Sequence, residues 1–258
     1  MNNDKALVWI KLAVLLLLFG FAGAIGMGAL APWIFGIDLS SPESLSSASK
    51  LAMLTTGTAF TTAIIFLFRK FADKKPVTSM GLVDNRWFKM SLVGLGLGGL
   101  VQIIVFLSLS LIGNYKMNSL SSLPAIIYFA AAAVVAWQEE TLYRAYIIEN
   151  LKIYGDRFAL IASAVIFVIP HFSGRGFSNP AEYISIFLFG MVVGMAYLRS
   201  HSIFLPLGFH TGFNFFEDIL LKTPAEISGA GFESLSWVAL GAVTLLLLTF
   251  LERYRSKF

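Results

Sequence analysis

One stretch of the sequence, PAIIYFAAAAVVAWQEETLYRAYII at residues 124–148, places three charged side chains inside an apolar run. No charged residue precedes Glu139 in this run, and apolar residues resume directly after Arg144. The run is long enough for a helix to cross a bilayer, where each ionised group costs at least ~2.5 kcal/mol. Charges kept at such a cost usually serve a function, so this stretch is the first candidate for a site.

The spacing of the three charges predicts two different environments. On an α-helix, Glu140 and Arg144 share a face and can form an ion pair, whereas Glu139 lies about 100° around the helix. Glu139, which we expect to be desolvated and without that partner, suits the work of a general base, and Glu140 suits a structural role beside Arg144. A buried ion network that only locks helices together explains the same residues equally well. The motif alone therefore leaves catalysis and packing open.

Composition indicates a polytopic membrane protein. The 258 residues are 57% hydrophobic and only 13% charged, with a mean hydropathy of +0.77, whereas soluble domains carry roughly 25% charged residues. The chain has no cysteine, which excludes a thiol nucleophile, a thiolate metal site and a disulfide framework. A net charge of +4 is modest, and its placement matters more than its total, so we do not predict nucleic-acid binding.

We predict an all-α fold, a bundle of about eight transmembrane helices in a single integral membrane domain over residues 1–258. The expected spans are residues 12–31, 51–68, 88–112, 124–150, 158 onwards, 180–198, 203–221 and 235–251. Pro32 directly follows the first span, in which Gly20, Ala24 and Gly28 would let a neighbouring helix approach closely. Gly94 and Gly98 in the third span fit the same close packing rather than a phosphate-binding loop.

The placement of basic residues predicts the orientation. Six of the 19 basic residues lie between Arg69 and Lys89, so this linker should face the cytoplasm. Eight spans with a cytoplasmic amino terminus place 14 basic residues inside and four outside. We therefore expect both termini in the cytoplasm. The short loops and the lack of cysteine favour a prokaryotic plasma membrane.

Three more polar side chains lie in or beside predicted spans. His171 follows Pro170, which should interrupt the fifth span, and His210 shares a helical face with Asn214. At ~1.5 Å per residue, Glu139, His171 and His210 lie roughly 16, 20 and 11 Å from the cytoplasmic helix ends, so they can meet in one bundle. Glutamate, two histidines and asparagine supply a base and the hydrogen-bond donors that amide hydrolysis by water requires. Either histidine alone could instead cap a broken helix.

These residues form three motifs on separate apolar spans: Glu139-Glu140-x-x-x-Arg144, Phe167-x-x-x-His171 and His210-x-x-x-Asn214. In this order they resemble the motifs of the CPBP (Abi) family of intramembrane proteases, named for CAAX prenyl proteases and bacteriocin-processing proteins. The resemblance covers a core of about residues 124–221. It implies an intramembrane endopeptidase, similar to type II CAAX prenyl endopeptidases, whose partners are the bilayer and a membrane-associated peptide or protein substrate.

The resemblance also implies a role for each matched residue. Glu139 would activate the water, His171 would assist it, and His210 and Asn214 would stabilise the oxyanion. The remaining matched residues, which would support the site, are Glu140, Arg144 and Phe167.

The need for a metal stays open in the sequence. Glu139, His171 and His210 would make a plausible His₂Glu zinc set with a fourth position for water. A metal-free site in which Glu139 is the direct base fits the sequence as well. We expect no required cofactor, because Asn214 resembles an oxyanion donor rather than a metal ligand.

Two other classes of function remain. One is a non-enzymatic membrane scaffold or bacteriocin immunity protein, and the other is a small proton- or ion-coupled transporter using Glu139 and Arg144. The intact set of polar residues argues against the scaffold, and the lack of an inverted repeat argues against the transporter.

Overall fold

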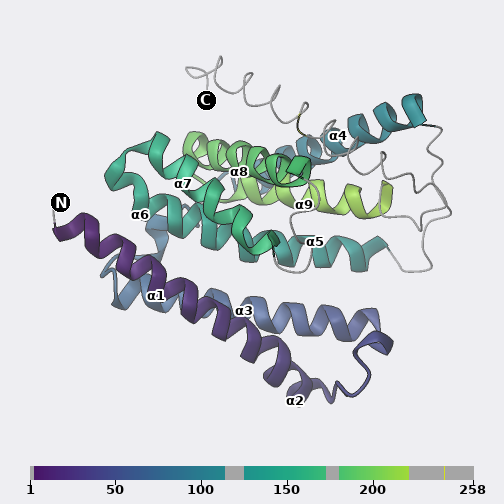
Figure 1. The fold of residues 1–258 in the computed structure, drawn as a ribbon, viewed down its shortest axis with the longest axis horizontal. Coiled ribbons are helices and arrows are strands. Elements are labelled where there is room, and N and C mark those ends of the chain that lie inside the picture. The colour runs from purple at the N-terminus through teal and green to yellow at the C-terminus, as the bar shows by residue number, and fades with distance from the viewer. Residues whose placement is uncertain (1–2, 114–124, 173–179, 221–240, 242–258) are drawn as a thin grey trace.

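The computed structural model describes residues 3–113, 125–172, 180–220 and 241, and every regular element in these ranges is a helix (Figure 1). The longer helices are α1 (Asn3–Ile25), α3 (Ser47–Phe71), α4 (Trp87–Gly113), α5 (Ala125–Glu140), α7 (Asp156–Val168), α8 (Pro180–Ser200) and α9 (Phe204–Leu220). Short segments are α2 (Ala31–Phe35), α6 (Glu149–Leu151), the π-helices η1 (Gly26–Leu30) and η4 (Thr141–Ile148), and the 3₁₀ turns η2 (Pro42–Ser44), η3 (Val77–Met80), η5 (Lys152–Tyr154) and η6 (Ile169–Phe172). The predicted all-α fold is confirmed.

Several of these helices have the length and composition of membrane spans. Four segments of the described ranges qualify: Asp4–Phe35, Ser47–Phe71, Trp87–Leu111 and Pro180–Ser200. The predicted fourth span is also one continuous helical segment, because α5, η4 and α6 follow one another without a break. The predicted eighth span, residues 235–251, lies outside the described residues except for position 241, so the number eight is not confirmed.

The first helix is longer than predicted and continues through Pro32. A π turn precedes this proline, and the N–H of Ala31 donates to the carbonyl of Gly26, five residues earlier. Proline lacks an N–H and its ring crowds the carbonyl four residues back, and the wider turn gives it room. The helix ends at Gly36, which adopts a left-handed φ of 63°.

The glycines that pack the first helix against α3 are not the predicted ones. A Cβ added at Gly20 or Gly28 would meet nothing within 4 Å, whereas one at Gly26 would lie 2.8 Å from the Cα of Gly57 on α3. The predicted stripe of Gly20, Ala24 and Gly28 is therefore wrong. The helix is apolar on all sides, so its sequence does not indicate which face turns to a neighbour.

The predicted close packing of α4 through glycine is confirmed, and its partner is α9. A Cβ at Gly94 would lie 2.3 Å from the carbonyl oxygen of Leu205, and one at Gly98 would lie 2.0 Å from that of Phe209. Conversely, a Cβ at Gly208 would lie 2.1 Å from the carbonyl oxygen of Ser91. The two backbones are in direct contact, so α4 holds α9 in one position.

Helix α5 lies in the middle of the bundle, between α3 and α9 (Figure 1). Its last turn is joined to α3 by two hydrogen bonds, from Trp137 Nε1 to Thr62 Oγ1 and from Gln138 Nε2 to Thr61 Oγ1, both 3.1 Å. Every residue of the following η4 segment is buried. The stretch that carries the charged motif is therefore the central element of the described bundle.

The contact between α4 and α9 can be tested with a matched pair of substitutions. Gly98→Ala should destabilise the protein by about 1–3 kcal/mol, because the added methyl meets a backbone atom that cannot rotate away. Gly96→Ala is the control, since a Cβ there meets nothing within 4 Å and alanine favours a helix. Thermal unfolding in one detergent should give a lower Tm for Gly98→Ala only. Equal values for the two variants would contradict the direct backbone contact.

Candidate active site

The carboxylate of Glu140, the last residue of α5, joins two elements of the candidate site. Its side chain is completely buried, and Arg144 Nη1 lies 3.2 Å from its Oε1. His210 Nδ1 on α9 lies 2.8 Å from the same oxygen. The predicted pairing of Glu140 with Arg144 is confirmed, and its contact with His210 is an addition that the sequence did not indicate.

The helix widens into a π-helix directly after Glu140. This segment, η4, runs to Ile148 and includes Arg144. Single π turns within α-helices are frequent at functional sites. Arg144 is further held by the carbonyl of Gly190 on α8, which accepts a hydrogen bond from Nη2 at 3.5 Å. The guanidinium group thus contacts both its own helix and α8.

His210 lies between the two glutamates. A carboxylate can only accept, so His210 Nδ1–H donates to Glu140 and Nε2 is left facing Glu139, whose Oε2 is 3.6 Å away. The Glu139 side chain is 26% exposed, in contrast to Glu140. One carboxylate is therefore buried and paired with Arg144, as the spacing predicted, whereas Glu139 is more exposed than the desolvated side chain that we expected.

Aromatic rings form the walls of the site. Phe167 is buried on α7, and the Arg144 guanidinium lies over its ring at 4.6 Å. The Phe167 ring centroid is 5.0 Å from the His171 ring and 6.4 Å from the His210 ring, and Phe189 lies 4.8 Å from His210 on another side. Such walls exclude water and strengthen the electrostatic interactions between the groups inside them.

His171 lies in the 3₁₀ turn η6, where α7 ends. The predicted interruption at Pro170 is confirmed, because the α-helix stops at Val168. The carbonyl of Phe167 accepts a hydrogen bond from His171 Nδ1–H at 2.9 Å, which leaves Nε2 as an acceptor. His171 is thus linked to the site by its hydrogen bond to the Phe167 carbonyl and by the contact between the two rings.

Asn214 lies one turn after His210 on α9 and is half-buried. Its side chain has no hydrogen bond to any other residue that the structure describes. It therefore shares the His210 face of α9, as its spacing predicted, without being joined to the glutamates.

The three candidate zinc ligands do not form a cluster. Within the described ranges, no group of three or more His, Asp or Glu side chains is arranged to hold a metal. Glu139 and His210 face each other, whereas His171 is bonded to the Phe167 carbonyl. The arrangement does not fit the three protein ligands of a catalytic zinc site.

Several buried polar atoms of the motif lack a hydrogen-bond partner among the described residues. They are Glu140 Oε2, Thr141 Oγ1 and Arg144 Nε and Nη1, the last of which makes only the ion pair with Glu140. Buried polar groups are usually satisfied, and exceptions concentrate at functional positions. This pattern favours a functional role for the motif over a role in packing alone.

Sequence reasoning missed Phe189 and the Gly190 carbonyl as well as the contact between His210 and Glu140. These groups come from segments far apart in the chain, and no local spacing relates them. Only the apolar character of residues 180–198 indicated that α8 would lie in the bundle.

Residues 121–216 match a family model described as type II CAAX prenyl endopeptidase Rce1-like. Searches of curated proteins and of solved structures found no match. The matched segment extends from just before α5 into α9 and contains all seven predicted site residues. The match supports the resemblance seen in the motifs: residues 121–216 are similar to the Rce1-like type II CAAX prenyl endopeptidases of the CPBP family.

Proposed function

We propose that this protein is an intramembrane endopeptidase in which Glu139 activates a water molecule to cleave a membrane-associated peptide. The observation that carries the proposal is a partly open carboxylate facing a histidine whose other nitrogen is held by a second, buried carboxylate. The match of residues 121–216 to the Rce1-like family model supports a CAAX-type intramembrane protease. The substrate we propose is a peptide or protein anchored at the membrane and cut near its carboxyl terminus.

The reaction begins with proton transfer from water to Glu139, and the resulting hydroxide attacks the scissile carbonyl carbon. The unprotonated Nε2 of His171 assists by accepting a hydrogen bond from the water. When the C–N bond breaks, Glu139 passes the proton to the leaving amine. Glu139 thus acts first as base and then as acid.

His210 and Asn214 stabilise the oxyanion in this scheme. Glu140 accepts a hydrogen bond from the Nδ1–H of His210 and fixes the ring, which in this scheme also carries a proton on Nε2. That Nε2–H donates to the oxyanion, and the Asn214 amide is the second donor. Arg144 forms the ion pair with Glu140, so it acts through Glu140 rather than on the substrate.

We propose that the chemistry requires no metal and no other cofactor. The direct pairing of Glu139 with His210 supports this, as does the separate hydrogen bond of His171. We also propose that the protein lies in a prokaryotic plasma membrane, which rests on the short loops and the lack of cysteine. Both termini would lie in the cytoplasm, which rests on the 14-to-4 distribution of basic residues.

Replacing Glu139 tests its role as the base. Glu139→Gln should lower cleavage by about 10²–10⁴-fold, because the amide has nearly the same shape but cannot accept a proton from water. The measurement is release of the terminal fragment from a carboxyl-terminally prenylated peptide in liposomes, with Tm checked in parallel. Glu43→Gln, an exposed residue of η2, is the charge-matched control and should cleave normally. Cleavage by Glu139→Gln at the wild-type rate would show that Glu139 is not the base.

Replacing Arg144 tests the buried ion pair. Arg144→Ala should destabilise the protein by about 3–5 kcal/mol, because Glu140 is left as a buried carboxylate without its cationic partner. The double variant Glu140→Gln, Arg144→Met carries no stranded charge and should recover much of the lost Tm in the same detergent. If the single variant melts like the wild type, the pair does not stabilise the fold.

Metal dependence can be measured directly. Elemental analysis of active purified protein should find well under one zinc per chain, and chelator-treated protein should still cleave. Stoichiometric zinc whose removal abolishes cleavage and whose return restores it would show that Glu139 works beside a metal-bound water or as a ligand.

The orientation in the membrane can be tested by labelling single introduced cysteines, because the chain itself contains none. In intact cells, Lys75→Cys should be protected from an impermeant thiol reagent, and Lys222→Cys should react. Lys222 lies outside the described residues, and its expected position rests on the predicted spans. The opposite labelling pattern would reverse the proposed topology.

A further inference from the structure

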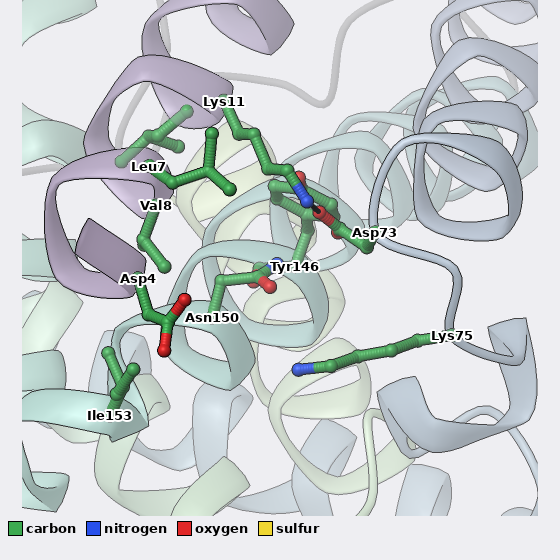
Figure 2. A pocket seen from close by; sticks show the side chains of 10 residues that line it. Asp4, Leu7, Val8, Lys11, Asp73, Lys75, Tyr146, Asn150 and Ile153 are labelled. Atoms are coloured by element: carbon green, nitrogen blue, oxygen red, sulfur yellow. Dashed lines mark hydrogen bonds and ion pairs between the residues drawn. The ribbon is translucent and has the colours of Figure 1, made fainter.

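A second polar site lies away from the glutamates, in a pocket of about 190 Å³ (Figure 2). It is formed by the first turns of α1, the loop after α3, and the segment where η4 passes into α6. Charged side chains from two places in the sequence, α1 and the loop after α3, line it, and none of them belongs to the three family motifs.

The pocket lies at the membrane end of two spans. The first candidate span starts at Asp4 and the second ends at Phe71, and α1 packs against α3. Asp4 and Lys75 are therefore at the level of lipid head groups. Leu7 and Ile153 line the same pocket and are each nearly half exposed, so an apolar surface continues from the charged groups toward the bilayer.

Two lysines and two aspartates line the pocket, and one lysine and one aspartate are already paired. Asp73 is nearly buried, with Lys11 Nζ 3.3 Å from its Oδ1 and Arg69 Nη1, which does not line the pocket, 3.6 Å from its Oδ2. Lys11 Nζ also donates to the carbonyl of Ala72 at 2.7 Å. The Asp73 charge is therefore matched without Lys75.

Lys75 and Asp4 are the free groups of the pocket. Neither side chain has a hydrogen bond or ion pair to another residue in the part of the chain that the structure describes. In Figure 2 the extended Lys75 side chain points across the pocket toward Asn150 and Asp4. Its direction follows from the backbone, because Lys74 adopts a left-handed φ of 54° and the N–H of Lys75 donates to the Arg69 carbonyl at 3.1 Å.

We propose that this pocket binds the head group of a glycerophospholipid. Lys75 and Lys11 would hold the phosphodiester, whose single negative charge would be matched by the ammonium group of Lys75. Asp4 would accept a hydrogen bond from an ammonium or hydroxyl group of the head-group alcohol. The acyl chains would run along Leu7 and Ile153. This assignment selects ethanolamine and glycerol head groups over choline, which has no N–H or O–H to donate.

The test is lipid binding to the full chain, purified in detergent and measured by native mass spectrometry. Wild-type protein should bind one molecule of phosphatidylethanolamine or phosphatidylglycerol. Its affinity for phosphatidylcholine should be lower. Lys75→Gln should weaken binding about tenfold or more, because a charge-assisted contact is lost. Lys70→Gln, an exposed lysine at the same end of α3 that does not line the pocket, is the matched control and should bind normally. Lys75→Arg should keep binding.

Two further measurements test which head group the pocket prefers and whether its ligand is a phospholipid or free phosphate. Asp4→Ala should lose the preference over phosphatidylcholine while keeping the phosphodiester contact. Inorganic phosphate at the same concentration should not compete; if it displaces the lipid, the pocket is a free-phosphate site and the lipid proposal is wrong. Equal affinity of wild type and Lys75→Gln, or binding of diacylglycerol as tight as that of the phospholipids, would likewise overturn it.

Discussion

The bundle depends on one buried carboxylate oxygen, Glu140 Oε1, which meets both Arg144 and His210. A carboxylate with no access to water is costly unless opposite charges and hydrogen-bond donors surround it. Arg144 comes from the same helix and His210 from α9, so satisfying this one group also holds α9 against α5. Because the buried Glu140 carboxylate needs both partners, α5 and α9 are held in one relative position.

The rest of the scaffold reinforces that constraint. The glycine contacts between α4 and α9 hold one side of His210 in place, and the bonds from Trp137 and Gln138 to α3 hold the turn that carries both glutamates. A site supported by packed helices on each side keeps its geometry better than one carried on loops. Glu139, the proposed base, therefore projects from a rigid position while its own side chain stays partly open. The lipid pocket that we propose lies against the same central helical segment, at Tyr146 and Asn150.

Predictions from the spacing within one helix were correct where the interaction lies within that helix. The Glu140–Arg144 pair and the helix end at Pro170 follow from the geometry of one helix and from the missing amide of proline. Close packing at Gly94 and Gly98 was also correct, because small residues on one face favour a near neighbour. The same rule failed for Gly20, Ala24 and Gly28, since the helix is apolar all round and the π turn before Pro32 shifts its register.

The sequence by itself determined the helical membrane class, the three motifs and the separate environments of Glu139 and Glu140, because these depend on composition and on spacing within single helices. Only the tertiary structure decided that His210 bonds to Glu140, that Phe167 links Arg144 to His171, and that the candidate zinc ligands do not gather. Each of these depends on how helices rotate and approach one another. In a chain that is apolar on most faces, helix rotation is set by side-chain and backbone packing, and periodicity carries too little information to specify it.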